Sequence, residues 1–422
     1  MARDLTSVAG ELQHLRFVHI NSTATGGGVA EILQSLVPLM NALGVSSEWV
    51  VVDPPEEFFQ VTKRIHNLTQ GEQGTLSPEE IHVYVSCIRG AADFIQQHQL
   101  GAEVWFLHDP QLLPLASLLP KTLDEIRFWV CHIDWTAPNM SVLNLLLPFT
   151  RAYDGLVFSR DSYVPPGLDE GIPVYIAPPA IDPLSPKNVP LDEPEATRIT
   201  AAMGIDPGRP LVTQVSRFDP WKDPRGVIDA YRSARQAVPG LQLALLGLSQ
   251  ASDDPQALEI LDSVTEYAAG DPDIHLYFYP EDLPDTIDNI VNAFQVASCL
   301  IIQKSIREGF GLTVTEAMWK GKVVLGGNVG GIRLQIEDGV TGYLVDSAEM
   351  CSRRIIEVER NTSLQQRMGE AARESVRQKF LLPRLALDYL RAAAANVSKS
   401  KTNSGGEKQR SRGFGTLDAI PL

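Results

Sequence analysis

The segment REGFGLTVTEAM holds two carboxylates in a pattern that suits the binding of a polar ligand. Glu308 and Glu316 lie eight residues apart and flank a Gly-Phe-Gly turn. If a helix begins near Leu312, its rise per residue places the two carboxylates roughly 10 Å apart. Paired carboxylates that cleave a glycosidic bond lie only about 5 to 9.5 Å apart. We therefore expect each carboxylate to accept hydroxyl groups from a different part of one elongated ligand.

Two cations follow an apolar strand in the segment QVSRFDPWKDP. Arg217 and Lys222 come just past that strand, and Asp223-Pro224 is typical of a helix N-terminus. Cations beside a helix N-terminus suit a diphosphate group. The alternative is a pair of solvated surface charges. Glu308, which follows another strand of the same half, favours the diphosphate site.

Two glycine-rich turns precede helical patterns and allow backbone N–H groups to approach a ligand closely. One turn consists of Gly309, Phe310, Gly311 and Leu312, and the other contains Gly26, Gly27 and Gly28 in HINSTATGGGVAEIL. The triple glycine is not the G-x-G-x-x-G fingerprint of dinucleotide-binding proteins, which argues against a dehydrogenase. A tight packing turn is the alternative for the triple glycine.

Polar and aromatic residues that follow strands of the first half are candidates for contacts with a sugar. Asp134 and Trp135 come directly after His132, and His108 follows an earlier strand. Carboxylates accept sugar hydroxyls, and an indole face packs on the apolar side of a pyranose. For each histidine, a structural role is the alternative. No metal-binding, P-loop or Ser/His/Asp motif is found, and the four cysteines form no C-x-x-C pair, which favours a reducing cytoplasm.

The elements that would position these residues alternate between apolar strands and helical patterns. Strands are expected at 15–21, 48–53, 102–108, 126–134, 155–159, 210–216, 241–247, 274–279, 298–303 and 322–327. This alternation predicts an α/β fold with parallel sheets covered on both faces. A proline-rich stretch at 177–196 divides the series into two doubly wound, Rossmann-like domains. In such folds ligands bind at the carboxyl ends of the strands, so we expect a central cleft that both domains face.

The predicted domain boundaries follow from these breaks. An N-terminal domain spans 1–195, a C-terminal Rossmann-like domain 196–380, a helix that crosses back 381–396, and a polar, disordered tail 397–422. The net charge of −16 across 422 residues gives no overall attraction to nucleic acid or an anionic membrane. The N-terminus lacks the apolar stretch of a signal peptide, and no run is long enough to span a membrane.

The motifs together resemble a known family. E-x7-E in REGFGLTVTEAM, preceded by SRFDPWKDP, resembles the retaining nucleotide-sugar glycosyltransferases of family four, which have the two-domain GT-B fold. HINSTATGGGVAEILQSLVPLM, EEFFQVTKRIHNLTQG, CHIDWT and SIREGFGLTVTEAMWKGK are similar to the trehalose glycosyltransferring synthases within that group. The resemblance covers about 15–395. It implies transfer of glucose from a nucleoside-diphosphate glucose to free glucose, which gives the α,α-1,1 disaccharide.

The resemblance also implies roles for individual residues. Arg217 and Lys222 would neutralise the leaving diphosphate, and Glu308 would hold the donor sugar. The remaining roles are donor contacts from Gly27, Gly28, Gly309, Phe310, Gly311 and Leu312, ribose binding by Glu316, a place beside the transferred sugar for His132, and acceptor contacts from Glu31, His108, Asp134 and Trp135.

Several questions stay open at this stage. Relatives within the group transfer sugars to glycerate, glycerol or phosphosugars, and a catalytically silent nucleotide-sugar-binding protein would share the fold. No tightly bound cofactor is expected. Mg²⁺ could bind the diphosphate, but no protein ligands for a metal ion are evident. The nucleotide base, the direction of the reaction and a possible homodimer are not decided by the sequence.

Overall fold

The computed structural model describes residues 1–25, 27–168, 171–247 and 255–403, without the side-chain surroundings of 255–257 and 399–403. Contacts within the chain divide it into two compact domains. The first domain consists of Met1–Ala177 together with the segment from Leu385 onward, and the second domain is Pro178–Arg384. Each domain contains one parallel six-stranded sheet, which confirms the predicted α/β class.

The sheet of the first domain has the strand order β2-β1-β3-β4-β5-β6, and its pairs are parallel. Its strands are β1 (Phe17–Asn21), β2 (Ser47–Val51), β3 (Val104–His108), β4 (Ile126–Cys131), β5 (Gly155–Phe158) and β6 (Val174–Ile176). Its helices are α1 (Ala2–Leu12), α2 (Gly28–Ala42), α3 (Glu56–Thr69), α4 (Pro78–Gln97), α5 (Leu115–Leu118), α6 (Met140–Leu146) and most of α15 (Leu382–Asn403).

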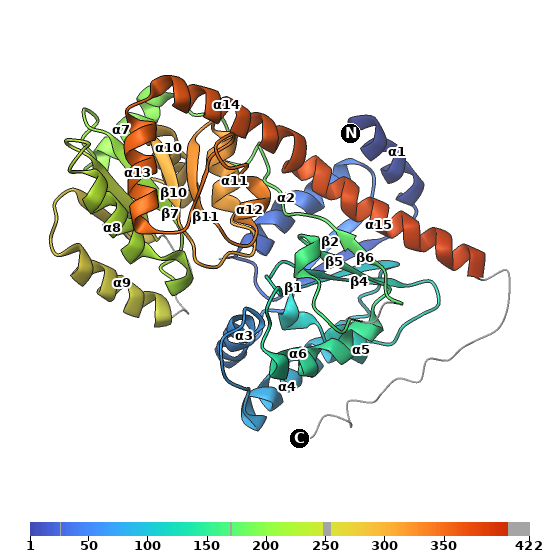
Figure 1. Ribbon diagram of the computed structural model, residues 1–422. Coiled ribbons are helices and arrows are strands. Elements are labelled where there is room, and N and C mark those ends of the chain that lie inside the picture. Colours follow the sequence, from blue (N-terminus) through green and yellow to red (C-terminus); the bar gives the residue numbers. More distant parts are fainter. Residues whose placement is uncertain (26, 169–170, 248–254, 404–422) are drawn as a thin grey trace. The chain divides into compact units, whose positions relative to one another are not determined.

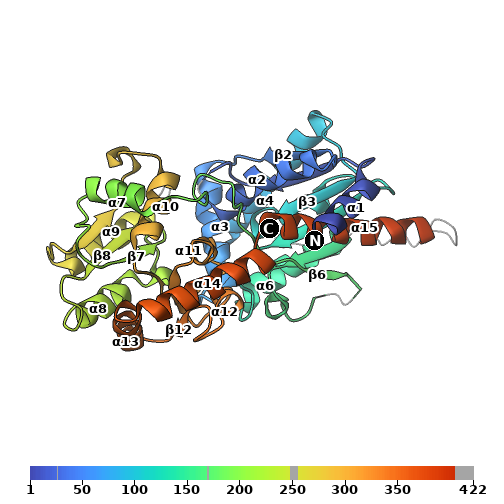
Figure 2. The ribbon, with the colours of Figure 1, turned by 90° about the horizontal axis from the view of Figure 1, so that it is seen from above.

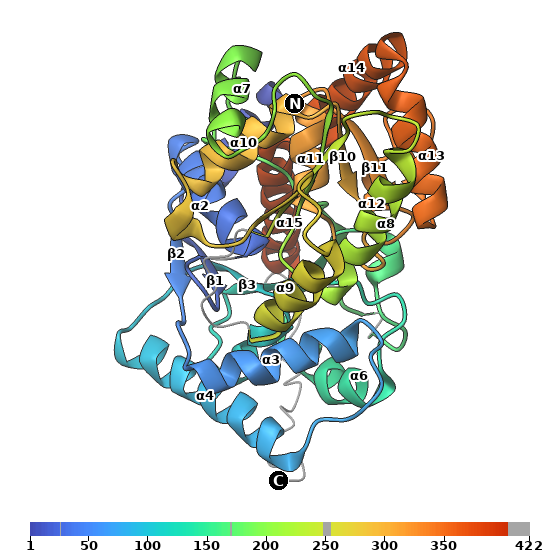
Figure 3. The same ribbon diagram turned by 90° about the vertical axis from the view of Figure 1, so that its left-hand side faces the viewer.

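Alternate residues of these strands face two different layers. Val18, Ile20 and Trp105 pack in a core with residues of α3, α4, α5 and α6. On the other face, Phe106 stacks between Phe128 and Tyr389 of α15. Figure 1 shows α3, α4 and α6 on one side of this sheet and α15 on the other, and Figure 3 shows α3 and α4 side by side. This period-two burial explains why the strands read as continuous apolar runs.

The sheet of the second domain has the order β12-β11-β10-β7-β8-β9. Its strands are β7 (Leu211–Val215), β8 (Gln242–Leu246), β9 (Ile274–Tyr277), β10 (Leu300–Gln303), β11 (Val323–Gly327) and β12 (Tyr343–Val345). Its helices are α7 (Glu193–Ala202), α8 (Pro224–Ala234), α9 (Pro255–Ala268), α10 (Ile287–Ala297), α11 (Leu312–Trp319), α12 (Ile332–Gln335), α13 (Ala348–Glu359) and α14 (Thr362–Lys379). Figure 2 shows α7 and α10 on one face of this sheet and α8 and α13 on the other.

The contact boundaries differ from the boundaries expected from the sequence. The break falls between Ala177 and Pro178, so the segment 178–195 belongs to the second domain. The C-terminal helix α15 extends to Asn403, and residues 397–403 are therefore helical rather than part of a tail. The rest of the expected tail, 404–422, lies outside the described residues, as does Gly26. None of the helices in the described ranges is long and apolar enough to cross a membrane.

Candidate active site

A cluster of charged groups lies where β7 and β10 end in the second domain. Lys222 closes a short 3-10 helix after β7, and its Nζ lies 2.5 Å from Oε2 of Glu308. Asp223 follows in the left-handed conformation, with φ 50° and ψ 53°, and its side chain accepts a hydrogen bond from the N–H of Gly226. This N-cap begins α8 and fixes the direction in which Lys222 leaves the sheet. The structure thus brings together two residues that lie 86 positions apart in the sequence.

Arg217 lies on the same loop as Lys222 but is far more exposed. Its side chain is 43% exposed, and its Nη2 is 3.8 Å from Oδ2 of Asp219. Asp219 in turn accepts from the N–H of Trp221 at 2.9 Å. An exposed guanidinium can bind an anionic ligand through its planar N–H groups.

Glu308 is 8% exposed, and its side chain contacts Lys222 and Ser305. Besides the ammonium group of Lys222, its Oε2 accepts from Oγ of Ser305 at 3.2 Å. Its backbone oxygen accepts from the N–H of Gly331 at 3.0 Å. A carboxylate fixed in this way keeps lone pairs for a hydroxyl ligand.

The Gly-Phe-Gly turn adopts a conformation that only glycine takes readily. Gly311 has a φ of +83° and is the N-cap residue of α11. Phe310 is 5% exposed, and its ring packs against Phe380, so its side chain anchors the turn in the core. Nε2 of the buried Gln335 donates to the backbone oxygen of Phe310 at 2.6 Å. Backbone contacts of Gly309, Gly311 and Leu312 with a ligand stay a prediction that this turn conformation allows.

Glu316 lies in α11 and is almost completely buried, at 1% exposure. Neither of its carboxylate oxygens has a hydrogen-bond partner among the described residues. The nearest cation is Lys187, whose Nζ is 3.6 Å from Oε1. A buried carboxylate without hydrogen bonds is costly, and such a group is typical of a site that binds hydroxyl donors.

The two loops that carry Lys222 and Glu308 are joined by contacts that the sequence analysis missed. Lys304, at 7% exposure, forms an ion pair with Asp223. The N–H of Ile306 donates to the backbone oxygen of Trp221 at 2.8 Å, and the guanidinium of Arg307 lies 4.8 Å from the Trp221 ring centroid. Lys304, Ile306 and Arg307 could be suspected from the sequence because they precede Glu308. Their contacts with the other loop could not be predicted, because a contact between two distant loops leaves no pattern in the local sequence.

The glycine turn of the first domain lies between β1 and α2. Gly27 is the N-cap residue of α2, and a Cβ atom added there would meet no atom within 4 Å. Gly27 and Gly28 are both exposed, and Glu31 lies half-buried in the first turn of the helix. Open space beside an exposed helix N-terminus suits the approach of a phosphate or sugar oxygen.

His132 follows β4, is partly exposed, and receives its support from buried neighbours. Its backbone N–H donates to Oδ1 of Asp109 at 2.9 Å, and its ring Nε2 lies 3.3 Å from Nδ1 of His108. His108 is only 2% exposed, and its other ring nitrogen lies 3.2 Å from Nδ1 of His19. Both nitrogens of His108 are thus engaged by histidines, so we no longer assign His108 to the acceptor.

The neighbours of His132 in the sequence point in different directions. Asp134 accepts hydrogen bonds at Oδ1 from the N–H and the hydroxyl of Thr136, at 2.8 and 2.5 Å. Trp135 has no exposed surface, and its ring packs edge-on against Trp129. An enclosed indole offers no face to a pyranose, so the expected sugar contact of Trp135 is not supported. The apolar run that ends in CHIDWT explains this result, because Trp135 continues the core.

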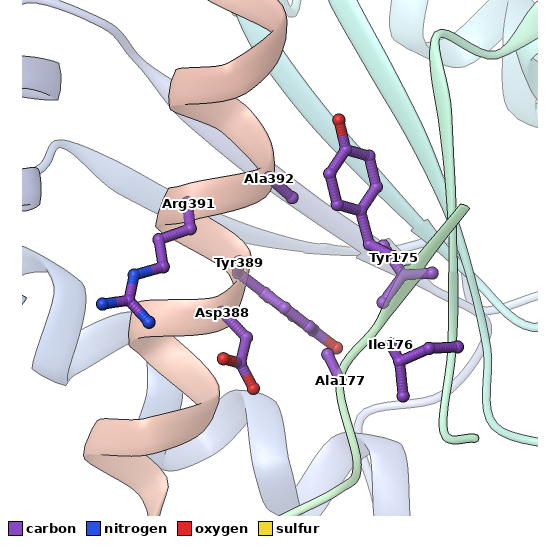
Figure 4. A pocket seen from close by; sticks show the side chains of 8 residues that line it. Tyr175, Ile176, Ala177, Asp388, Tyr389, Arg391 and Ala392 are labelled. Atoms are coloured by element: carbon purple, nitrogen blue, oxygen red, sulfur yellow. The ribbon is translucent and has the colours of Figure 1, made fainter. Parts of the chain in front are cut away.

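The first domain also contains a pocket that is lined by residues other than the predicted site residues. Figure 4 shows its lining by Tyr175, Ala177, Asp388, Tyr389 and Arg391, which come from the end of β6 and from α15. No predicted site residue lines it. The described residues also contain no group of three His, Cys, Asp or Glu side chains suited to a metal ion.

Comparisons with known proteins match both domains. Residues 19–165 match the family model "Trehalose synthase, N-terminal domain", and residues 196–375 match "Glycosyl transferases group 1". A trehalose synthase of Rubrobacter xylanophilus is 42% identical over 393 residues, which is 93% of each chain.

Solved structures agree on the fold. Sucrose-phosphate synthase of Thermosynechococcus elongatus superposes with a TM-score of 0.69 at 18% identity, over 91% of this chain and 99% of the other. Anabaena HepE in complex with UDP-glucose superposes with a TM-score of 0.65 at 14% identity, over 91% and 100%. The chain therefore belongs to the trehalose synthase family and is a hexosyltransferase with the GT-B fold.

Proposed function

We propose that the protein transfers glucose from a nucleoside-diphosphate glucose to free glucose, with retention at the anomeric carbon, and forms α,α-1,1 trehalose in a reversible reaction. Membership of the trehalose synthase family supports the product. The charged cluster of the second domain supports the donor class. The two loops carry cations, an acidic residue and a glycine turn at one edge of the sheet.

The observation that carries the proposal is the buried carboxylate of Glu316. Its two oxygens lack hydrogen-bond partners in the described part of the chain, and it lies on the helix that starts at the Gly-Phe-Gly turn. A ribose supplies two adjacent hydroxyl donors, which match the two oxygens of one carboxylate. A diphosphate that lies against the turn would place the ribose on one side and the sugar on the other. This order assigns Glu316 to the ribose and Glu308 to the hexose.

In the proposed reaction, the bond between the donor anomeric carbon and the diphosphate oxygen breaks first. The bonding electron pair stays on the diphosphate, whose growing charge is stabilised by Lys222 and Arg217. Cations aimed at a developing charge are often the largest contribution to catalysis. The C1 hydroxyl oxygen of the acceptor glucose then bonds to the sugar on the face that the diphosphate left. The departing phosphate oxygen takes the hydroxyl proton, so no protein nucleophile is assigned.

The ion pair between Lys222 and Glu308 is compatible with the binding of a donor diphosphate. Lys222 and Glu308 form an ion pair at 2.5 Å. When the donor binds, Lys222 can turn its ammonium group to the diphosphate, while Ser305 continues to donate to Glu308. In the proposal, Glu308 then accepts a hydroxyl of the donor sugar.

The first domain supplies the remaining contacts in the proposal. The backbone at Gly27 and Gly28 meets an oxygen of the diphosphate, and His132 lies beside the transferred sugar. Glu31 and Asp134 are proposed for the acceptor, because both are half-buried carboxylates near strand or helix ends. A magnesium ion, if used, would be bound through the diphosphate itself.

The test is a donor and acceptor panel on the full-length protein. UDP-, ADP- and GDP-glucose are each incubated with glucose, glycerate, glycerol or glucose 6-phosphate, and release of the nucleoside diphosphate is measured. We expect release that depends on free glucose, with one nucleotide preferred. Faster release with another acceptor would replace glucose in the proposal. Donor binding without any release would identify a catalytically silent protein.

A further inference from the structure

Three imidazole rings form a continuous chain of hydrogen bonds within the first domain. They come from the neighbouring strands β1 and β3 and from the residue that follows β4. His19 Nδ1 lies 3.2 Å from His108 Nε2, and His108 Nδ1 lies 3.3 Å from His132 Nε2. The His108 and His132 rings have an interplanar angle of 0°. A ring N–H lies in the plane of its ring, so this edge-to-edge arrangement favours a straight N–H···N hydrogen bond.

The inner rings have no access to water, and burial keeps all three neutral. His19 is 0% exposed and stacks on Phe106 with the centroids 4.9 Å apart. Burial lowers the pKa of His19 to about 3 and the pKa of His108 well below its usual value. Burial also lowers the pKa of His132, although the nearby charge of Asp109 opposes this shift. At neutral pH each ring therefore carries one hydrogen.

A neutral ring donates through one nitrogen and accepts through the other, which couples the three tautomers. Because both nitrogens of His108 are used, all donation along the chain must run in one direction. If it ran toward His19, the Nε2–H of His19 would be buried without an acceptor. If it runs toward His132, the atom left without a partner is the unprotonated Nε2 of His19, which carries no hydrogen. Buried N–H groups without acceptors are the rarer defect, so donation toward His132 is favoured.

This direction decides what His132 offers to a ligand. Its Nε2 accepts from His108, so its hydrogen must be on Nδ1, and none of the described residues forms a hydrogen bond with that nitrogen. His132 is partly exposed, whereas the other two rings are enclosed.

We propose that His19 and His108 are positioning residues that lock His132 as its Nδ1–H tautomer, so that His132 presents a hydrogen-bond donor to an oxygen of the transferred sugar or its diphosphate. The contact with substrate rests on the proposed function, whereas the tautomer lock rests only on the hydrogen bonds among the three histidines. Free neutral histidine favours the opposite tautomer, with the hydrogen on Nε2. The hydrogen bond made by one ring nitrogen sets the state of the other.

The tautomer can be read directly by NMR of the protein labelled with ¹⁵N-histidine at pH 7.5. His132 is assigned through the spectrum of His132→Gln. In the wild type we expect Nδ1 to show the shift of a protonated nitrogen and Nε2 that of a bare one. In His108→Phe we expect His132 to revert to the Nε2–H form. A wild-type Nε2–H signal, or an unchanged tautomer in His108→Phe, would overturn the lock.

Kinetics test whether the lock serves the reaction. His108→Phe is expected to lower kcat roughly tenfold, the worth of one hydrogen bond, with a smaller change in donor KM. His19→Phe removes the hydrogen bond that His19 donates to His108, and it is expected to lower kcat by less than His108→Phe does. His19→Asn is expected to restore both kcat and the tautomer, because its amide N–H occupies the position of Nδ1. Unchanged kcat in His108→Phe despite a changed tautomer would overturn the positioning role.

A matched control separates these effects from general damage to the domain. Tyr153→Phe removes a buried hydrogen bond of 2.7 Å to the backbone oxygen of Leu113 and contacts none of the three histidines. It is expected to leave the tautomer and kcat unchanged. If the wild type transfers glucose from no donor, the proposed function fails in the activity assay, while the NMR spectrum still reports on the lock. The two failures are therefore distinguishable.

Discussion

At the residue scale, Lys222 is the side chain whose loss should affect chemistry most. In Lys222→Ala the ammonium group opposite the leaving diphosphate is gone, and kcat should fall by about 10²- to 10³-fold, the usual effect of losing one stabilising donor. Initial rates with saturating donor measure this change. The control is Lys379→Ala, which removes an exposed lysine at the end of α14. Near-normal turnover in a natively folded Lys222→Ala would contradict the assignment.

Glu316 leads to a different prediction, because its buried carboxylate has no hydrogen-bond partner among the described residues. Glu316→Gln should raise the donor KM about tenfold with little change in kcat, since a ribose contact persists from substrate to transition state. The same substitution removes the ion pair with Lys187, but Lys187 keeps Asp288 at 3.9 Å, so the free energy of unfolding should change little. Urea denaturation and steady-state kinetics check the two parts. A variant that is both unstable and normal in KM would refute the ribose assignment.

The lowered pKa of the buried His19 should make the free energy of unfolding depend on pH. The pKa of His19 is about 3 in the folded protein, below its ordinary value near 6.5, so the unfolded chain binds more protons in acid. The stability from this residue is full above about pH 6.5 and is lost as the pH falls toward 3, by roughly 1.4 kcal/mol per pH unit. Urea denaturation at pH 7 and pH 5.5 should show a smaller loss of stability in His19→Phe than in the wild type. Equal losses would contradict this prediction.

How far the sequence predicted the site depends on the kind of residue. Lys222 and Glu308 follow strands in the sequence, and the structure joins them as an ion pair, while Glu316 lies in the helix after the glycine turn. His108 and Trp135 also follow strands, yet both are buried. A histidine or tryptophan next to a strand end can turn inward as readily as outward, and local sequence does not record the direction.

At the element scale, the Gly-Phe-Gly turn is packed against the loop before α12. A Cβ atom at Gly331 would lie 2.4 Å from the backbone oxygen of Gly309 and 2.4 Å from Cα of Phe310. Gly331→Ala must therefore displace the turn, and overpacking of this kind costs about 1 to 3 kcal/mol of unfolding free energy. Donor affinity should fall more than tenfold, because the turn and Glu308 move together.

A matched control for this prediction is available in the first domain. A Cβ atom at Gly90, inside α4, would meet nothing within 4 Å. Gly90→Ala should increase stability by up to about 1 kcal/mol through helix propensity, with unchanged donor affinity. Thermal unfolding and donor titration compare the two variants. A Gly331→Ala protein with wild-type donor affinity would contradict the role assigned to the turn.

The elements themselves were largely predictable. All the expected strands are present, because strands buried on both faces read as apolar runs between helices. The strands β6 and β12 were missed, and each spans only three residues, Val174–Ile176 and Tyr343–Val345. A pattern of period two cannot be recognised over so short a length. The end of α15 was also placed too early, since the polar residues 397–403 lack an apolar period.

At the scale of the whole molecule, the sequence predicted two Rossmann-like domains but misplaced the break between them. The proline-rich stretch was assigned to the first domain up to residue 195, whereas contacts assign everything from Pro178 onward to the second. Asn188 shows why, because its side chain accepts from Nζ of Lys320 at 3.2 Å. A segment without regular structure can still be fixed by side-chain contacts, which composition does not reveal.

The measurement that tests the central claim most directly is the NMR structure of the product. The protein is incubated with its preferred nucleoside-diphosphate glucose, labelled with ¹³C at the anomeric carbon, and with unlabelled glucose. We predict one disaccharide in which the labelled anomeric carbon has the α configuration and is bonded through oxygen to the anomeric carbon of the second glucose. A β configuration, or a linkage to any other carbon of the acceptor, would contradict retaining transfer to form α,α-1,1 trehalose.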